Sequence, residues 1–456
     1  MSDYSSNEFR VQMPENASRI IDVIQKAGYE AYAVGGCVRD VLMGRKPHDW
    51  DITTSALPPE IKSLFKRTVD TGLKHGTVTV LMGGEAFEVT TYRIDGEYAD
   101  GRHPDQVVFT RSLEEDLKRR DFTINAMAYN HEAGLVDLFD GRGDLRRKCI
   151  RAVGDPEKRF SEDALRILRA VRFAAQFGFG IEPETAGAIR ELAPTLQKIS
   201  AERIREELNK LLVSDHPEML RSAYVMGVTR QFLPEFDRMM ETLQNNPHHC
   251  FTVGEHTIHA VQNTRPDLTL RLTMLLHDVG KPPCRWTDDK GIDHFWGHPE
   301  TGAEMTEEIL RRLKYDNQTV RNVTRLVLLH DQPLPETDAA LRRTIAKVGE
   351  ELFPLLLEVH EADVLAQGAF FLEDKLELIA ECGRRFDAVM ESRQALALKD
   401  LALSGKDLIL AGIKPGVAMG KLLETMLDDV LDHPEHNTRE YLLETYVGGR
   451  SSHEQT

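Results

Sequence analysis

The sequence predicts an α+β fold in which an N-terminal domain with a mixed sheet precedes an all-α remainder. Its 456 residues exceed what one hydrophobic core holds, so we expect two to four domains. Short runs of apolar residues with glycine-rich turns lie between Tyr32 and Gly154, as is typical of strands. From Asp155 onward, apolar residues recur at helical spacing instead.

The first elements surround a glycine pair. Residues 14–28 predict an amphipathic helix that begins near Pro14 and ends at Gly28. A short strand, 32–34, leads into Gly35 and Gly36, and a helix over 38–43 follows. Residues 48–53 then predict a second strand.

Two carboxylates lie on that second strand, at Asp49 and Asp51. Residues i and i+2 of a strand point to the same face, so the two like charges need a cation between them. Gly35 and Gly36 allow backbone amides to approach a phosphate closely. Together these features predict a Mg²⁺-dependent nucleotidyl-transfer site. The Asp-x-Asp pattern alone also fits a solvated strand end after a surface turn.

Further candidates follow along the chain. Residues 76–81 and 86–92 predict a hairpin with its turn at Gly83 and Gly84, on which Glu88 is either a third carboxylate or an exposed strand residue. The Gly-, Asp- and Pro-rich segment 94–106 predicts a substrate-handling loop or a disordered connector.

An Arg-Arg-Asp segment comes next. Arg119 and Arg120 offer forked donors to a triphosphate, while Asp121 and Asn125 offer partners to ribose hydroxyls, although a helix cap with a basic flank explains the pattern equally well. Strands or links at 136–141 and 150–154 close this domain.

A helix that opens with Ser161 as N-cap is predicted to place Asp163 and Arg166 one turn apart. Its buried stripe consists of small and aliphatic residues: Ala164, Leu168, Val171 and Ala175. A solvated ion pair is the common meaning of the Asp163–Arg166 spacing. Residues 141–175 carry ten Lys and Arg against five Asp and Glu, a local excess of +5 in a chain of net charge −17, which is compatible with a phosphate-rich ligand.

The middle of the chain holds a second constellation of possible ligands. An apolar helix ends in adjacent His and Asp residues, followed by Gly-Lys-Pro, and imidazole with carboxylate suits a divalent cation. The constellation comprises His248, His249, His256, His259, His277, Asp278, His298, His330, Asp331 and Asp363. Of these, His259 is predicted to be a helix-surface residue and Asp331 a cap or turn residue.

The composition indicates a cytoplasmic protein. The sequence has no apolar stretch long enough for a membrane span and no basic-then-apolar leader. Its five cysteines form no CxxC pair, so reduced thiols are expected.

Five motifs in order resemble the class II tRNA nucleotidyltransferases, which include the bacterial poly(A) polymerases. They are Gly35-Gly36-x-Val-Arg39-Asp40 with Asp49-x-Asp51, Arg119 to Ala126, Glu162-Asp163-x-x-Arg166, the 202–208 helix, and 437–442. The resemblance covers nearly the whole chain. It implies that Asp49 and Asp51 hold Mg²⁺, and that Gly36, Arg39 and Arg120 bind the triphosphate of ATP or CTP. It also implies that Asp163 and Arg166 select the base, with Arg169 and Arg172 completing the pocket.

The implied base selection is chemically sound. Cytosine and adenine each present an exocyclic amine beside an unprotonated ring nitrogen, whereas uracil and guanine present a carbonyl beside an N–H. A carboxylate that accepts from the amine and a guanidinium that donates to the ring nitrogen therefore accept C and A without a template. The implied reaction is attack of the tRNA 3′ hydroxyl on the α-phosphate, with release of pyrophosphate.

Family members add CCA, only CC, or only A. By resemblance, CC-adding members lack the flexible loop between the carboxylate strand and the Arg-Arg-Asp motif, so the segment 94–106 disfavours CC-only addition. Bacterial poly(A) polymerases usually carry a strongly basic C-terminal extension, so the acidic to neutral end, 428–456, disfavours a poly(A) polymerase. A-only addition stays open at this point.

The histidine-rich middle resembles an HD phosphohydrolase domain, and the metal ligands that this resemblance implies are His256, His277, Asp278, His298, His330 and Asp363. That resemblance implies a Mg²⁺, Mn²⁺ or Ni²⁺ site and a phosphatase or 2′,3′-cyclic phosphodiesterase activity, with a purely structural HD fold as the alternative. The predicted organisation is a nucleotidyltransferase head (1–145), a helical neck (146–215), a connector (216–245), an HD domain (246–365) and a helical tail (366–456).

Overall fold

A computed structural model of the chain describes residues 11–95, 107–245, 251–367 and 372–448. The chain divides into two compact units, Met1–Asp237 and Arg238–Thr456. The division falls inside the predicted connector. Within the described residues, no helix is long and apolar enough to cross a membrane.

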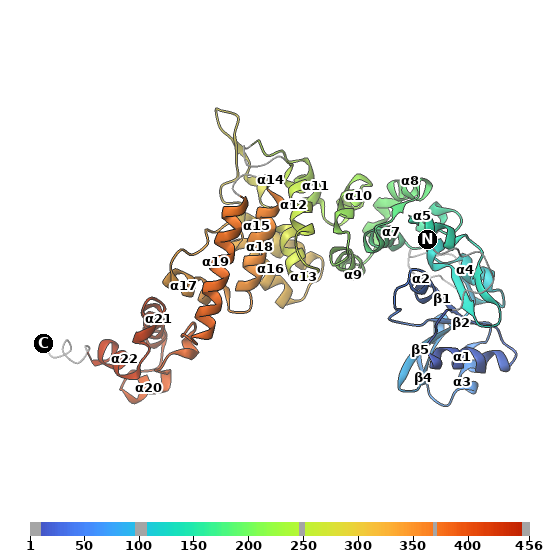
Figure 1. Cartoon of the computed structure of the whole chain (residues 1–456), viewed down its shortest axis with the longest axis horizontal. Helices are drawn as coiled ribbons and strands as arrows, with labels where there is room; N and C mark the ends of the chain where they lie inside the picture. Colours follow the sequence, from blue (N-terminus) through green and yellow to red (C-terminus); the bar gives the residue numbers. More distant parts are fainter. Residues whose placement is uncertain (1–10, 96–106, 246–250, 368–371, 449–456) are drawn as a thin grey trace. The chain divides into compact units, whose positions relative to one another are not determined.

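The first unit is built on a seven-stranded mixed sheet with the order β3-β4-β5-β2-β1-β8-β9 (Figure 1). Strands β2 and β5 pair in parallel, and the other neighbours are antiparallel. The strands are β1 (Ala31–Val34), β2 (Ile52–Thr54), β3 (Thr68–Gly72), β4 (Thr77–Met82), β5 (Glu85–Thr91), β8 (Met127–Asn130) and β9 (Gly134–Asp137).

Short helices cover the sheet and connect its strands. They are α1 (Glu15–Lys26), α2 (Gly36–Leu42), α3 (Pro58–Leu64), α4 (Leu113–Lys118) and α5 (Gly141–Arg147). The core contains the apolar stripe of α1, with Ile20, Ile21 and Ile24 fully buried against the strands. This packing fixes the edge of the sheet where β1 ends.

The predicted hairpin is present. Its turn residues Gly83 and Gly84 have φ of 61° and 86°, which a two-residue turn between right-twisted strands requires. Strand β6 (Arg93–Asp95) pairs with β7 (Val107–Phe109), so Ile94 and Asp95 of the predicted loop belong to a strand. Residues 96–106 of that loop lie outside the described residues.

The rest of the first unit is helical. A short parallel pair, β10 (Cys149–Ile150) and β11 (Gly180–Ile181), accompanies α6 (Pro156–Glu162), α7 (Leu165–Phe177), α8 (Pro183–Leu192), α9 (Ala201–Leu212) and α10 (Leu220–Val225). The predicted stripe of α7 is buried. Helix α11 (Pro234–Glu241) spans the division between the units.

The N-cap predicted at Ser161 is wrong. Asp155 caps α6, because its side chain accepts from the amides of Glu157 and Lys158 and Pro156 presets the first turn. The chain leaves the helix at Asp163, where φ is −142° and ψ is 104°, and α7 begins after it. Asp163 therefore lies at a break between two helices rather than on one helix with Arg166.

Where the structure describes the second unit, its regular elements are helices and one short hairpin of β12 (Trp286–Thr287) and β13 (Asp293–His294). Its helices are α12 (Val253–Gln262), α13 (Leu268–Leu276), α14 (Lys281–Cys284), α15 (His298–Arg312), α16 (Asn317–Leu329), α17 (Asp338–Val348), α18 (Phe353–Ala366), α19 (Leu372–Glu391), α20 (Gly405–Leu410), α21 (Val417–Asp432) and α22 (Arg439–Tyr446). The α+β class predicted from the sequence is confirmed.

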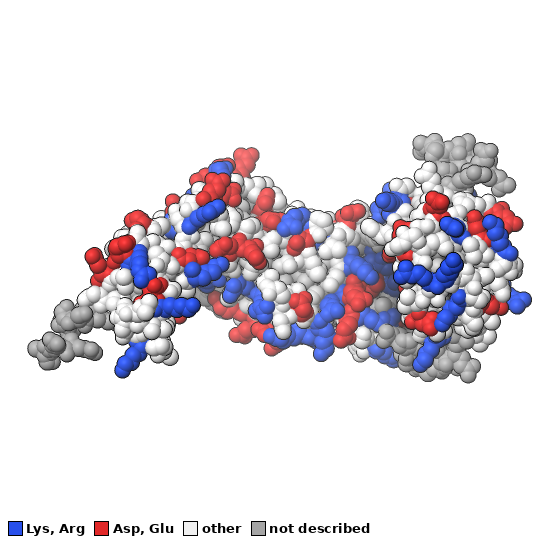
Figure 2. Space-filling view, turned by 90° about the horizontal axis from the view of Figure 1, so that it is seen from below, with Lys and Arg blue, Asp and Glu red and all other residues white. Residues whose placement is uncertain are grey.

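Charges of both signs are interspersed on the face shown in Figure 2. The net charge of −17 is thus not gathered into one acidic surface on that face.

Candidate functional site

The glycine turn after β1 forms one wall of the candidate nucleotide site. Gly35 has φ 80° and ψ −124°, a conformation essentially limited to glycine. A Cβ atom there would lie 2.9 Å from Nη1 of Arg120. Helix α2 begins at Gly36, so its first amides are free of intrahelical partners. Gly35 therefore allows an arginine to lie against a helix N-terminus.

The two predicted catalytic aspartates precede β2 rather than lie within it. Strand β2 begins at Ile52, although the carbonyl of Asp51 still accepts from the amide of Val34 on β1. Ile52 pairs with Val89 of β5, so the residues just before them, Asp51 and Glu88, lie at matching positions of neighbouring strands. Glu88 is exposed between buried Phe87 and Val89. The sheet register thus brings Glu88 beside Asp51.

The surroundings of Asp51 raise its proton affinity. Partial burial raises the pKa of Asp51, the charge of Arg120 lowers it, and Glu88 and Asp49 raise it again, with a net upward shift. These three carboxylates do not bring their oxygens within 4.8 Å of one another among the described residues. Oxygen donors of like charge are what Mg²⁺ binds, so the donor set fits this ion.

Arg39 is buried behind the glycine turn. Its guanidinium donates to Oδ1 of Asn125 and to Oδ1 of Asp40, at 2.9 and 2.8 Å for the two bonds to Asp40. It also lies over the rings of Phe173 and Phe177, with 5.3 and 4.9 Å to their centroids. Arg39 therefore links the sheet domain to α7.

Arg120 is positioned by a carboxylate that sequence reasoning missed. Asp116 is fully buried, accepts from Oγ1 of Thr53 at 3.0 Å, and pairs with Arg119 and Arg120 at 2.8 and 3.6 Å. Burial alone would raise the pKa of Asp116, but the two arginines and Thr53 lower it. Nε of Arg120 is buried and has no hydrogen-bond partner among the described residues. The available signal was the i, i+4 spacing from Asp116 on α4 to Arg120, which lies two residues beyond the end of that helix.

Asp121 and Asn125 form an internal network instead of standing free. Nε and Nη2 of Arg169 donate to Asp121 at 2.9 and 2.7 Å, and Nδ2 of Asn125 donates to it at 3.0 Å. Although burial would raise the pKa of Asp121, Arg169 and Asn125 hold it well below its usual range. A continuous chain of contacts therefore runs from Arg169 through Asp121 and Asn125 to Arg39.

Each member of the proposed base-selecting pair is fixed by its own partners. Asp163 accepts from Arg203 of α9 at 2.7 Å. Arg166 pairs with Glu162 at 2.7 Å and donates to the carbonyl oxygen of Arg119 at 3.1 Å. The amide of Arg166 donates to the Asp163 carbonyl at 3.0 Å, so the two residues stay one turn apart across the break that precedes α7.

Arg172 lies six residues beyond Arg166 on α7. It pairs with Glu207 of α9 at 2.8 Å and lies 3.6 Å from the centroid of Phe173. Both charged side chains are buried. Arg203 and Glu207, which anchor this wall, were missed as individual residues because their roles depend on how α9 packs on α7.

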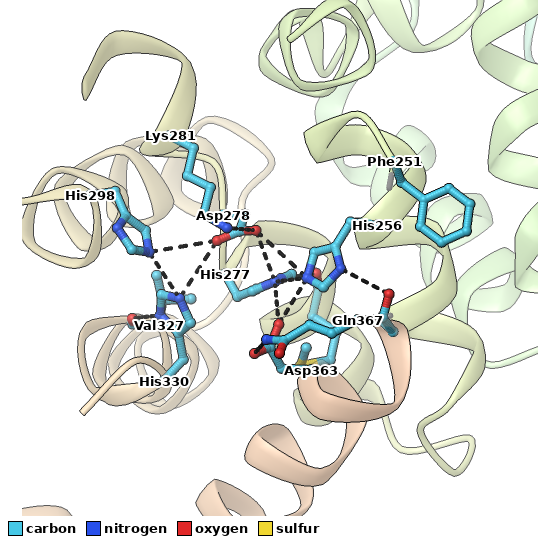
Figure 3. A network of polar contacts seen from close by, with 12 residues as sticks. Phe251, His256, His277, Asp278, Lys281, His298, Val327, His330, Asp363 and Gln367 are labelled. Atoms are coloured by element: carbon cyan, nitrogen blue, oxygen red, sulfur yellow. Dashed lines mark hydrogen bonds and ion pairs between the residues drawn. The ribbon is translucent and has the colours of Figure 1, made fainter. Parts of the chain in front are cut away.

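The second unit brings together the six predicted metal-ligating residues (Figure 3). Five helices position them: α12 carries His256, His277 and Asp278 come directly after α13, α15 begins at His298, His330 comes directly after α16, and α18 carries Asp363. His277 and His330 follow the last residues of α13 and α16, where the helix dipole favours a cation.

The ligand atoms form two groups that share Asp278. His256 and His277 have Nε2 atoms 3.3 Å apart and lie 3.8 and 3.3 Å from Oδ2 of Asp278. His298 and His330 have Nε2 atoms 3.3 Å apart, and each lies 3.6 Å from Oδ1. Asp363 belongs to the first group, 2.8 Å from Nε2 of His256.

The histidine tautomers are set by the backbone. The Nδ1 atoms of His277, His298 and His330 face carbonyl oxygens of residues three earlier, at 2.7, 2.9 and 2.6 Å, and that of His256 faces the carbonyl of Ala366 at 3.3 Å. A carbonyl only accepts, so each Nδ1 carries the proton and each Nε2 points its lone pair inward. This is the arrangement of metal-ligating histidines.

The electrostatics of the cluster favour a cation. Burial would lower the pKa of His277, but Asp278 and Asp363 outweigh it and raise that pKa to about 10. Asp278 is buried and pairs with Lys281 at 2.7 Å, a residue that sequence reasoning did not select. His360, also missed, lies in the same environment, where burial lowers its pKa to about 4.

Two cavities border this cluster. One, of about 650 Å³, is lined by His330, His360 and Asp363, with Lys375 and Arg385 on its wall. The other, of about 370 Å³, is lined by His298 and Lys281. Asp331 lines both cavities. His259, predicted to be a helix-surface residue, is half-buried on α12, and its ring centroid lies 4.6 Å from that of the exposed Phe251. His248 and His249 lie outside the described residues.

Three family models match the chain. The poly A polymerase head domain matches residues 31–151, the RNA- and SrmB-binding site of polymerase A matches 178–240, and tRNA nucleotidyltransferase domain 2 matches 300–446. The last begins inside the region predicted as an HD domain.

Relatives match nearly the whole chain. A CCA-adding enzyme of Leuconostoc mesenteroides is 35% identical over 96% of this chain and 99% of its own length. The structure of the Bacillus stearothermophilus CCA-adding enzyme in complex with CTP matches with a TM-score of 0.72 and 33% identity, covering 96% of this chain and 99% of that one. The Thermotoga maritima CCA-adding enzyme complexed with tRNA shares the fold, with a TM-score of 0.55 at 22% identity over 95% and 94% of the two chains. The chain therefore belongs to the family of CCA-adding enzymes, which are nucleotidyltransferases.

Proposed function

We propose that the first unit adds CCA to tRNA 3′ ends from CTP and ATP without a nucleic-acid template. The observation that carries this proposal is the continuous network from α2 to α7: Arg39 contacts Asn125, Asn125 contacts Asp121, and Asp121 contacts Arg169. Such a network fixes the nucleotide-contacting side chains before any ligand arrives.

Each part of the site has a role in this reaction. Asp49 and Asp51, with Glu88 beside them, would hold Mg²⁺, which would supply charge neutralisation to the triphosphate and activation of the attacking 3′ hydroxyl. The α2 N-terminus at Gly36, together with Arg39 and Arg120, binds phosphate oxygens, and the unpartnered Nε of Arg120 supports this. The tRNA 3′ oxygen bonds to the α-phosphorus, and pyrophosphate leaves.

Base selection rests on Asp163 and Arg166. Because Arg203 holds Asp163, and Glu162 with a backbone carbonyl holds Arg166, neither side chain is free to turn toward a different base pattern. A fixed acceptor beside a fixed donor selects cytosine and adenine and rejects uracil and guanine. Arg169 and Arg172 complete this wall.

The transferase is tested by Asp51→Ala with the full chain, tRNA, CTP and ATP. Loss of nucleotide addition supports the assignment, whereas retained activity contradicts it. Asp22→Ala, an exposed position on α1, is the matched control and leaves addition unchanged.

We propose a second activity for the other unit: hydrolysis of a phosphate ester at a divalent metal centre. The inward-facing Nε2 atoms around Asp278 support it, and the mixed nitrogen and oxygen donors suit Mn²⁺, Ni²⁺ or Mg²⁺. Such an ion makes a water nucleophilic at neutral pH. Nη2 of Arg385 is buried without a hydrogen-bond partner among the described residues, at the wall of the 650 Å³ cavity, and fits a phosphate oxygen.

For an RNA 3′-phosphate the balance is simple. Water adds to phosphorus, the bond from phosphorus to the 3′ oxygen breaks, that oxygen takes a proton, and inorganic phosphate leaves. Asp278→Asn, an isosteric change, should abolish phosphatase activity and leave nucleotide addition intact. Loss of both activities, or retention of the phosphatase, contradicts the proposal.

A further inference from the structure

A short hairpin beside the metal-binding cluster exposes an unusual aromatic surface. Trp286 and Trp296 are 52% and 75% exposed. Their rings stack with centroids 5.4 Å apart and an interplanar angle of 29°, and the His294 ring lies 5.3 Å from each. Large aromatic rings grouped at the surface mark binding sites more often than structural ones.

The hairpin is braced from beneath. Asp293 is buried and accepts from Oγ1 of Thr287 at 2.6 Å, from the amide of Asn245 at 2.8 Å, and from Arg285 at 3.0 Å. Burial raises the pKa of Asp293, but these donors outweigh it and bring it down to about 2. Nε2 of His294 is also 3.1 Å from Asp288. The rings are therefore held in place before any ligand binds.

The aromatic surface opens directly onto the cluster. Trp296 and His294 line the same 370 Å³ cavity as His298 and Lys281. Only Gly297 separates Trp296 from His298, so their Cα atoms lie at most about 7 Å apart. A ligand on the tryptophan thus reaches the cluster within the length of one nucleotide.

A nucleotide unites the two chemistries that this cavity offers. Its base has a flat π-face that stacks on an aromatic side chain, with little dependence on base identity. Its phosphate ester matches the cluster and the Lys281 ammonium. We propose that Trp296, backed by Trp286 and His294, stacks the terminal base of an RNA 3′ end and so presents that end's phosphate ester to the histidine–aspartate cluster. This inference rests on the proposed phosphohydrolase activity.

The test uses the full chain with its metal and two short RNA oligonucleotides that carry a 3′-phosphate. One ends in adenosine and the other in an abasic ribose. Trp296→Leu should raise the KM for the adenosine end about tenfold, with kcat unchanged and the KM for the abasic end unchanged, because only the stacking contact is lost. Trp296→Phe should keep most of the preference for a base. Leu410→Ala, which removes an exposed apolar side chain from α20, is the control and changes neither constant.

Unchanged KM values in Trp296→Leu, or an equal rise for both oligonucleotides, would overturn the proposed stacking platform, which is Trp296 backed by Trp286 and His294. If the unmodified protein hydrolyses neither oligonucleotide, the phosphohydrolase proposal fails. Base stacking on Trp296 is then tested by a tryptophan-fluorescence titration, which needs no hydrolysis. In that titration, quenching by the adenosine end that disappears in Trp296→Leu supports the platform. Equal quenching in both proteins overturns it.

Discussion

At the scale of single residues, the transferase site holds Asp51 in surroundings that disfavour its ionised form. The pKa of Asp51 is raised because partial burial and the charges of Glu88 and Asp49 outweigh the opposing charge of Arg120. A carboxyl with a raised folded-state pKa binds its proton more tightly in the folded state than in the unfolded chain. Its ionised form therefore lowers stability at neutral pH, and this loss shrinks as the pH falls toward the folded-state pKa.

Asp51→Asn should therefore raise the Tm of the metal-free protein at neutral pH while it abolishes nucleotide addition. The stabilisation should decrease at lower pH, where Asp51 itself becomes protonated. Thermal unfolding from pH 8 to pH 5, with and without Mg²⁺, measures both effects. A lower Tm for Asp51→Asn at pH 7 would contradict the repulsion among these carboxylates.

Gly35 permits the closest approach in the site. Gly35→Ala places a Cβ atom 2.9 Å from the Arg120 guanidinium and strains a backbone with φ of 80°. We expect about a hundredfold loss of kcat/KM, because displacement of a phosphate-binding group by about 1 Å has that order of effect.

Gly84→Ala is the matched control for Gly35→Ala. It has a similar φ of 86°, but no atom lies within 4 Å of its Cβ position. It should cost about 1 kcal/mol of stability and leave the kinetic constants unchanged. Equal kinetic losses in the two variants would show that backbone strain, and not the approach of Arg120, explains the requirement at Gly35.

At the scale of elements, the nucleotide wall depends on how α9 packs on α7. Glu207 of α9 pairs with Arg172 at 2.8 Å and lies 3.8 Å from Arg169, and the carboxylate is buried. Removing one partner of a buried pair leaves the other charge without compensation.

Glu207→Ala should lower the free energy of unfolding by about 3 kcal/mol and raise the KM for both nucleotides. Urea unfolding and steady-state kinetics measure the two effects. Glu206→Ala, exposed on the same helix, is the control and should change stability by less than about 0.5 kcal/mol. If the two variants lose the same stability, the α7–α9 ion pair does not hold the wall.

Local signals predicted the elements of the first unit well. The glycine pairs and the alternation of apolar residues fix β1, β4 and β5, so the sequence could place the glycine turn and the Gly83-Gly84 hairpin. Helix starts were harder: Ser161 resembles an N-cap, but Asp155 followed by Pro156 is the stronger one. The anchoring roles of Asp116, Arg203 and Glu207 depend on tertiary packing, which one sequence does not reveal.

The histidine–aspartate cluster of the second unit was likewise predicted only in part from the sequence. The resemblance to an HD domain indicated all six residues, and the structure brings them together. It did not indicate His360 or Lys281, since a histidine or lysine on a helix usually faces solvent. Lys281 lies three residues after Asp278 and His360 three residues before Asp363, so each is close to its carboxylate along the chain. That these turns face one another depends on how the helices pack.

At the scale of the whole molecule, two compact units each contain one candidate active site. Substitutions in one site should therefore leave the chemistry of the other intact. Mn²⁺ or Ni²⁺ at micromolar concentration should raise the Tm of the unmodified protein and of Asp51→Asn by binding the folded state. Asp278→Asn should lose that gain, as measured by thermal unfolding with a chelator as reference. An equal metal-dependent gain in Asp278→Asn would contradict binding at the cluster.

CCA addition by the first unit can be measured with three tRNA substrates that end before CCA, after the first C, and after CC. Each is incubated with Mg²⁺ and CTP, ATP or both, and the 3′ ends are sequenced. We expect that, with both CTP and ATP, the protein completes every substrate to CCA and then stops. Extension of the CC-ended tRNA alone, by a single A, would show an A-adding enzyme, and long A tails would show a poly(A) polymerase. Either result would contradict the proposed function.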